Sequence, residues 1–376
     1  MNLYDTGIKI LQQRKFAFAE RILPYYFASV GCHIFNLVNQ EIQMFWEHGQ
    51  IPNMRLHLML VSPPGWLKSF TLKQLLRGKS SLFGDTQLNP VFTSTMTEAG
   101  FVGTIKFGEG GEPISVPGLC QEYSRSIIGI EEFSAIAQMM EVGYGRGLDV
   151  AYLTALDSGW VYKRLAAGAI EYHTDMTLWA GTQPMRFDMT AGMPRRLFFL
   201  QIVPTRQDKQ IIKYARRQGI GITNSVTQTV GIKAMIEELF TKTKKLTAVH
   251  FEKELYKTLD QLQIPHYEES LYERLALGYT LVRKNFGEEL FVQVDDTLKQ
   301  LIMRSYQWRL QLKRGTKVAQ VILTLRDYGG RMDMNFLRRT LLDLSLSWTE
   351  STEIVRQLVR DGTCKTDKKD IVLVGG

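Results

Sequence analysis

The sequence predicts an α/β fold in which helices flank a parallel sheet, followed by a helical region and a C-terminal winged helix-turn-helix. Three observations lead to this prediction. A short apolar run near residue 60 leads directly into a loop and a helix. Strands and helices then alternate as far as Val203, which is typical of a parallel sheet. Residues 316–374 show three helical segments and a short hairpin.

The composition indicates a packed globular chain. Of 376 residues, 44% are hydrophobic and 22% charged, a length and balance typical of two to three folded domains. No apolar run is long enough for a membrane span, and the first residues lack a secretory pattern. The three cysteines, which are far apart, fit reduced thiols. We therefore expect a cytoplasmic or nucleoid-associated protein without a membrane partner. Its net charge of +8 permits nucleic-acid binding.

The first 50 residues are expected to form a helical arm. Apolar residues recur at helical spacing over residues 8–23, and Pro24 interrupts them. A second helix is predicted from about Tyr25 to Trp46, ended by a glycine and a proline. This arm could pack on the sheet or serve as an oligomer contact.

The stretch from Leu58 to Ser69 predicts a strand, a phosphate loop and a helix. In such a loop the backbone N–H groups face an anion, the lysine reaches the outer phosphates and the hydroxyl binds magnesium. Ser62 and Leu67 occupy the two positions where the usual pattern has glycine. An ordinary strand-to-helix turn with a surface lysine is the alternative. The expected nucleotide-binding residues are Pro64, Gly65, Trp66, Leu67, Lys68 and Ser69.

Two carboxylates follow the next apolar strand, in the stretch Ser126–Phe133. Ligands of open α/β sheets bind at the carboxyl ends of the strands, so Glu131 and Glu132 are expected at a ligand site. Nucleotide hydrolysis needs one group at the metal and one that orients or deprotonates water. We assign Glu131, with Ser69, to Mg²⁺ and Glu132 to the water. The alternative is a pair of solvated surface acids.

The middle of the chain predicts two hairpins and two further strands. Gly108–Gly111 marks one hairpin tip, and Val161–Tyr172 predicts a second hairpin with basic residues. Residues 147–157 are expected to be helical. The strands are Met176–Pro184 and Arg195–Val203.

The remainder predicts helices. Residues 206–229 indicate a connector, and residues 230–310 show helical spacing without strand signals. Ser347 and Glu350 match a capping box at the start of the last helix. Residues 311–376 hold 12 Lys and Arg against 8 Asp and Glu.

The order of these elements resembles the AAA+ module of minichromosome maintenance replicative helicases and of related viral and plasmid helicases. The resemblance covers roughly residues 51–376. It is carried by Lys68-Ser69, by the stretch Thr95–Gly103, which is similar to the family's helix insert, and by Glu131-Glu132-Phe133, which is similar to its Asp-Glu-Phe motif. We expect the short helical arm to stand in place of the family's large N-terminal domain.

This resemblance implies roles for further residues. Lys163 or Arg164 would contact DNA, and Gln183 would be the polar sensor residue before a proline. The remaining implied residues are Arg196 as arginine finger, with Arg195 as alternative, and Arg274 as a lid arginine that contacts nucleotide. Each of these basic residues could instead be a surface charge or pair with acids of its own subunit.

We therefore expect an ATPase with ATP and Mg²⁺ as ligands, acting on DNA as a homo-oligomeric ring, a hexamer by resemblance. The favoured function is an ATP-dependent DNA helicase or translocase in DNA replication. The alternatives are an ATP-switched DNA-binding initiator or loader, and a regulator whose nucleotide site has decayed. The expected domains are a helical arm (1–50), a nucleotide-binding core (51–205), a connector and helical lid (206–310) and a winged helix (311–376).

Overall fold

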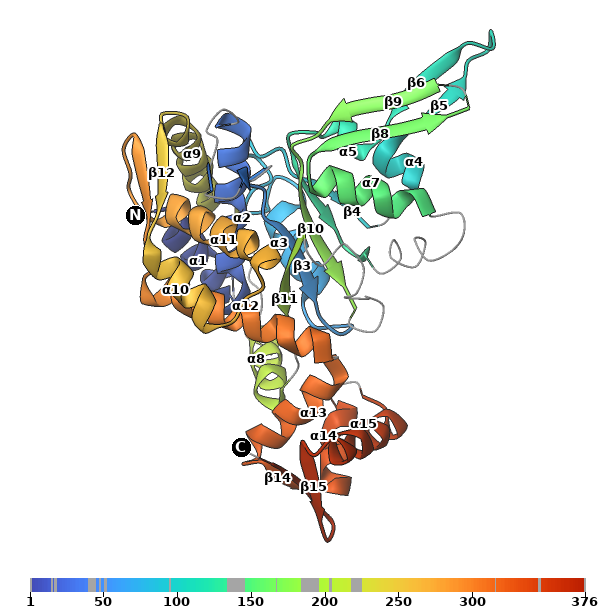
Figure 1. Ribbon diagram of the computed structural model, residues 1–376, viewed down its shortest axis with the longest axis vertical. Coiled ribbons are helices and arrows are strands. Elements are labelled where there is room, and N and C mark those ends of the chain that lie inside the picture. Colours follow the sequence, from blue (N-terminus) through green and yellow to red (C-terminus); the bar gives the residue numbers. More distant parts are fainter. Residues whose placement is uncertain are drawn as a thin grey trace.

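A five-stranded parallel sheet lies at the centre of the molecule (Figure 1). The computed structural model describes residues 2–14, 16, 19–39, 45–46, 49–50, 53–94, 96–133, 146–166, 168–183, 196–202, 205–217, 225–314, 316–343 and 346–374. In spatial order the strands are β11 (Leu197–Gln201), β3 (His57–Val61), β10 (Thr177–Thr182), β7 (Ile127–Ile130) and β4 (Val91–Thr93). All neighbouring pairs are parallel. The predicted α/β class is confirmed, and the sheet is compatible with a phosphate-loop fold.

The sheet is buried on both faces. Along β3, Leu58 and Leu60 belong to one hydrophobic core, whereas Met59 and Val61 belong to another. Successive side chains of a strand point to opposite faces, so both faces of β3 are covered. This double burial explains the uninterrupted apolar run Leu58–Val61.

Helices build the two cores. The first core contains residues of α1 (Leu3–Gln13), α2 (Ala19–Val38), α3 (Lys68–Leu76), α9 (Ser225–Thr243), α10 (Lys253–Gln261), α11 (His266–Arg283) and α12 (Asp296–Arg314). The second contains residues of α4 (Glu98–Val102), α5 (Leu119–Glu122) and α7 (Arg146–Leu156). The carboxyl ends of β3, β7 and β10 meet at one edge of the sheet between these layers.

The N-terminal helices pack on the sheet and are part of the main core, the first of the two expected roles. The Ser29 hydroxyl donates to the Leu56 carbonyl at 2.6 Å and accepts from the Trp179 indole at 2.7 Å. Helix α2 crosses α11 at backbone contact, where a Cβ on Gly31 would lie 2.5 Å from the Gly278 carbonyl oxygen. The two glycines therefore allow the close helix crossing.

The predicted limits of these helices are wrong. Pro24 lies inside α2, which ends at Val38. Phe45–Trp46 (β1) pairs with Gly49–Gln50 (β2) instead of continuing the helix. The Asn39 side chain donates to the Thr243 carbonyl at 2.6 Å, so the end of α2 is held by a partner far along the chain.

The region after the sheet contains two short strands that the sequence pattern did not reveal. β12 (Ala248–Phe251) pairs in parallel with β13 (Glu289–Val292), which contradicts the expectation of an all-helical 230–310 segment. The expected connector contains a helix, α8 (Arg206–Arg217). Four-residue strands carry too little period-2 signal to stand out between long helices.

The C-terminal unit has its own core. It consists of α13 (Thr316–Asp327), α14 (Met334–Asp343), α15 (Trp348–Arg360) and the antiparallel strands β14 (Arg331–Asp333), β16 (Asp370–Leu373) and β15 (Cys364–Asp367). The Ser347–Glu350 capping box is present at the start of α15. The three predicted helices and the hairpin are confirmed, and β14 adds a third strand.

Two antiparallel hairpins extend together from the sheet and are called the projecting arm (Figure 1). They are β5 (Gly103–Phe107) with β6 (Pro113–Pro117), and β8 (Trp160–Leu165) with β9 (Gly168–His173). Both hairpins were predicted. A Cβ on Gly168 would lie 3.0 Å from Ile105, which shows that the hairpins touch. Among the described residues, no helix has the length and apolar character needed to cross a membrane.

Candidate active site

The loop between β3 and α3 has two residues with left-handed backbone. Gly65 has a φ of 78° and Leu67 has a φ of 65°. Leu67 stands at the position where the phosphate-loop pattern has glycine, and it adopts the conformation that glycine favours. For a residue with a side chain this conformation costs on the order of 1–3 kcal/mol. The loop thus keeps the backbone turn although the glycine is absent.

Two side chains hold the loop to the protein. The Ser62 hydroxyl is buried and donates to the Trp66 carbonyl at 3.2 Å. The Trp66 ring is buried in the main core, and Leu67 packs against that core. These contacts offset the backbone strain at Leu67. Ser62, at the other glycine position of the pattern, therefore has a local structural role.

Lys68 joins the loop to the next strand ends. Its Nζ lies 2.7 Å from Glu132 Oε2, and Gln183 Nε2 donates to the same oxygen at 3.3 Å. Lys68, Glu132 and Gln183 come from the ends of three different elements and meet at the carboxyl edge of the sheet. The sequence prediction had assigned all three to one site, and the structure brings them together.

Gly181 of β10 makes room for the lysine. A Cβ on Gly181 would lie 2.5 Å from Lys68 Cγ, 2.7 Å from Lys68 Cδ and 2.8 Å from the Glu131 carbonyl oxygen. The aliphatic part of Lys68 therefore runs across the strand at a point where no side chain fits. The sequence did not reveal this role of Gly181, because a glycine in a strand indicates that another group approaches the backbone closely but does not identify that group.

Glu131 lies beside Ser69 and Lys73. Lys73 Nζ is 2.9 Å from Glu131 Oε1. Burial raises the pKa of Glu131, but the hydrogen bonds from Lys73 and Ser69 outweigh it and hold the pKa below its ordinary value. Lys73 was not among the predicted site residues. Its position one helical turn after Ser69, on the same face of α3, is the signal that could have found it.

The Ser69 and Glu131 oxygens fit a magnesium ion. Mg²⁺ prefers oxygen ligands and, at phosphate sites, takes one or two carboxylates together with phosphate and water oxygens. Three or more acidic, histidine or cysteine side chains do not gather into a metal site anywhere in the described chain. Ser69 and Glu131 would hold the ion. Lys73 would have to share Glu131 with it.

Arg196 lies at the opposite edge of the sheet. It immediately precedes β11, and its Nη2 is 2.7 Å from Asp157 Oδ2. β11 runs parallel to β3, so five residues of strand, or ~17 Å, separate Arg196 from the phosphate loop of its own chain. Arg195, the alternative, falls outside the described residues.

Arg274 does not join the group at the loop. Its side chain is buried, and its Nη1 donates to the Arg55 carbonyl at 3.3 Å, before the start of β3. Burial lowers the pKa of Arg274. The fold therefore does not bring Arg274, the predicted lid arginine, to the phosphate loop of its own chain. Helical spacing alone does not tell which face of α11 covers the sheet.

Lys163 and Arg164 lie on opposite faces of β8. Arg164 is exposed, whereas Lys163 is half-buried on the face that it shares with buried Val161. Consecutive strand residues alternate, so the two cannot act side by side. Both belong to the β8/β9 hairpin, as predicted.

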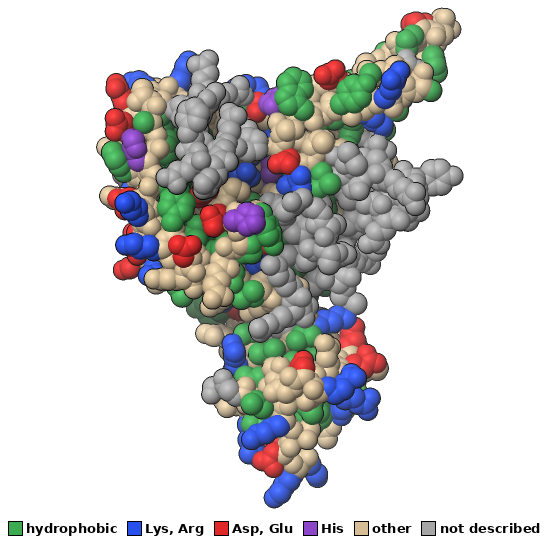
Figure 2. Space-filling view, in the orientation of Figure 1, with side chains coloured by type: hydrophobic (Ala, Val, Ile, Leu, Met, Phe, Trp, Pro, Cys, Tyr) green, Lys and Arg blue, Asp and Glu red, His purple; other side chains and the backbone are tan. Residues whose placement is uncertain are grey.

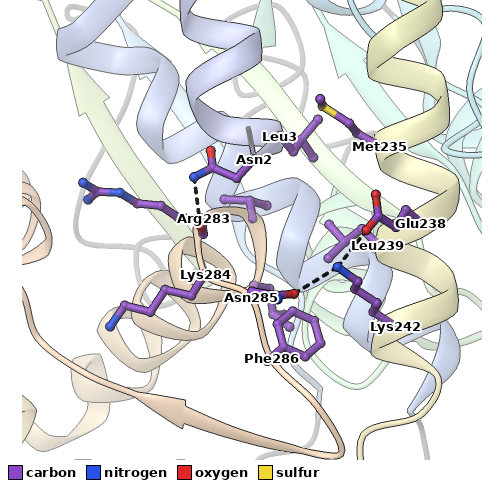
Figure 3. A pocket seen from close by; sticks show the side chains of 12 residues that line it. Asn2, Leu3, Met235, Glu238, Leu239, Lys242, Arg283, Lys284, Asn285 and Phe286 are labelled. Carbon is purple, nitrogen blue, oxygen red and sulfur yellow. Dashed lines mark hydrogen bonds and ion pairs between the residues drawn. The ribbon is translucent and has the colours of Figure 1, made fainter.

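A cavity of about 440 Å³ lies elsewhere, between α1, α9 and the end of α11 (Figure 3). Lys242, one of the lining residues, has its Nζ 2.7 Å from Glu238 Oε1 and 3.0 Å from Asn285 Oδ1. None of the residues at the phosphate loop lines it. We therefore assign the chemistry to the loop, where the polar groups converge, and not to this cavity.

Comparison with known proteins adds no family to this description. Neither the protein-family models nor the curated proteins contain a match to the sequence.

Proposed function

We propose that the protein is an AAA+ ATPase that moves along DNA as an oligomeric ring, in the manner of a replicative helicase. The convergence of Lys68, Glu132 and Gln183 at the carboxyl edge of the sheet carries the proposal. Such edges are where α/β sheets bind ligands. A lysine, an acid and an amide there, behind a loop with left-handed backbone, suit the binding and hydrolysis of a nucleoside triphosphate.

Each side chain at the site has a separate role in hydrolysis. Lys68 binds the outer phosphates, and Gln183 orients the attacking water. Glu132 accepts the proton of that water as general base. Lys68 is bonded to Glu132 in this structure, so binding of a phosphate by the lysine would release the carboxylate. Bound magnesium would neutralise charge on the phosphates, and Ser69 and Glu131 would hold it.

Arg196 would act on a neighbouring subunit. The length of the sheet separates it from its own phosphate loop. An arginine finger for this site must therefore come from another copy, as in a ring where each nucleotide lies between two subunits. Hydrolysis would then be coupled to assembly, and the projecting arm would face the DNA.

The C-terminal unit supports the second candidate, an ATP-switched DNA-binding initiator or loader. Its three helices and three strands have the make-up of a winged helix. Five exposed residues of α15 and the following hairpin are basic: Arg356, Arg360, Lys365, Lys368 and Lys369. A basic helix face of this kind suits duplex DNA. Here ATP would control assembly and the C-terminal unit would select the site.

Substitution of the proposed base tests the proposed chemistry. Glu132→Gln keeps the shape of the side chain but cannot accept a proton, so it should bind ATP and hydrolyse it orders of magnitude more slowly. Equilibrium binding of a fluorescent ATP analogue and single-turnover hydrolysis measure the two steps. Wild-type hydrolysis by the variant would rule out Glu132 as the base. Strand displacement by the wild type separates the helicase from the initiator.

A further inference from the structure

The outer face of the β8/β9 hairpin carries a row of exposed planar side chains. Trp160 and Tyr162 are 58% and 63% exposed, and Arg164 follows in the same row. Alternate residues of a strand share a face, so the three side chains lie in one file. Figure 2 shows hydrophobic side chains exposed along the projecting arm, with Lys and Arg beside them.

The residues of β9 that pair with this row limit its width. Trp160 pairs with His173, Tyr162 with Glu171 and Arg164 with Ala169. The Trp160 and His173 rings meet edge to face at 5.2 Å between centroids. Within the β8/β9 hairpin the flanking residues are thus small or polar, and the row of apolar side chains is one residue wide. Protein interfaces need a broader apolar centre than this.

The spacing of the row matches unstacked bases. Alternate residues of a strand lie ~6.7 Å apart, twice the ~3.4 Å rise of stacked bases. A base therefore fits between or upon successive side chains. Aromatic rings and the arginine plane stack on any base, which gives binding without sequence preference.

The charges beside the row favour contact of the aromatic rings with bases and not with phosphates. Arg164 offers a cation to a phosphate at the outer end of the row. Glu171, beside Tyr162, repels phosphates from its middle, so bases and not phosphates would face the rings there. Duplex DNA, whose bases are stacked and paired, cannot use such a row.

We propose that Trp160, Tyr162 and Arg164 form a base-stacking platform for single-stranded nucleic acid. The inference rests on the proposed action on DNA and identifies the residues and the form of DNA that the arm binds. Stacking supplies affinity through Trp160 and Tyr162, and Arg164 adds a salt-sensitive contact.

Binding of a fluorescein-labelled oligothymidylate, followed by anisotropy in the full chain without nucleotide, tests the platform. Trp160→Ala and Tyr162→Ala should each weaken affinity by about 5- to 150-fold. Trp160→Phe and Tyr162→Phe should retain most of it. The Tyr214→Ala/Phe291→Ala double variant is the matched control, because these aromatics are 66% and 52% exposed elsewhere. It should bind as wild type.

Salt dependence distinguishes stacking from charge. Arg164→Ala should reduce the slope of log affinity against log salt by about 0.7, whereas the aromatic variants should leave the slope unchanged. Equal affinity of the Trp160→Ala/Tyr162→Ala double variant and the wild type overturns the platform. A change in the oligomeric mass of this double variant, measured by light scattering, also overturns the platform, because the row would then be a contact between subunits.

The outcome is separable from that of the proposed function. If the wild type hydrolyses ATP but its affinity for single strands does not depend on Trp160 and Tyr162, the ATPase proposal is retained and the platform is refuted. If single-strand binding depends on these aromatic residues but the wild type does not hydrolyse ATP, the platform is supported and the ATP-driven motor is refuted. No binding of the oligothymidylate by the wild type would overturn the platform together with the proposed role on single strands.

Discussion

Replacing Gly181 with alanine should damage the site while leaving the fold in place. The new methyl group would lie 2.5 Å from Lys68 Cγ and 2.8 Å from the Glu131 carbonyl oxygen, and ordinary contacts begin near 3.4 Å. The lysine would have to move by about 1 Å, and displacements of this size at a catalytic group cost on the order of 100-fold in rate. We therefore expect kcat for ATP to fall by about 100-fold.

The control is a glycine in the neighbouring strand. A Cβ on Gly129 would lie 2.6 Å from the end of the Leu76 side chain, which belongs to the core. Both substitutions overpack the sheet and should cost about 1–3 kcal/mol of stability. Only Gly181→Ala should lower turnover beyond what its loss of stability explains. Thermal unfolding and steady-state ATP hydrolysis measure the two effects. Equal turnover of the two variants would refute the proposed path of Lys68.

Three further predictions follow from the site. Lys73→Ala removes a contact that lowers the pKa of Glu131, so Glu131 would stay protonated to higher pH. The acid limb of the kcat–pH profile should therefore shift to higher pH, and an unshifted limb would contradict the pairing of Lys73 with Glu131. Arg196→Ala should reduce hydrolysis by about 10³–10⁵-fold, and mixing it with Lys68→Ala subunits should restore part of the activity, provided that exchange is verified. Asp157→Ala removes an ion pair of Arg196 within the subunit and should cost far less than Arg196→Ala; an equal loss would make the pair structural.

The parts of the fold that the sequence predicted are those encoded locally. The buried strand before Glu131 is an apolar run, and the capping box at Ser347 is a four-residue pattern. Such signals need no partner from elsewhere in the chain. The same holds for the phosphate loop, where Lys68 and Ser69 follow a strand and begin a helix.

The parts that the sequence did not predict depend on distant partners. Gly31 and Gly278 meet only because α2 and α11 cross, so the close approach of these two helices could not be predicted from local sequence. Arg274 is buried against the carbonyl of Arg55, a contact between residues far apart in sequence. Gly181 and Lys73 acquire their roles from Lys68 and Glu131, which reach them across the sheet edge.

ATP hydrolysis by the purified wild-type chain and by Lys68→Ala, each with and without single-stranded DNA, tests the central claim most directly. The lysine is the group that reaches the phosphates, and its Nζ lies 2.7 Å from the proposed base. We expect turnover by the wild type that rises with single-stranded DNA, and none by the variant although it is folded by circular dichroism. Equal turnover by wild type and Lys68→Ala, or no turnover by either, would contradict the assignment of this edge of the sheet as an ATPase site.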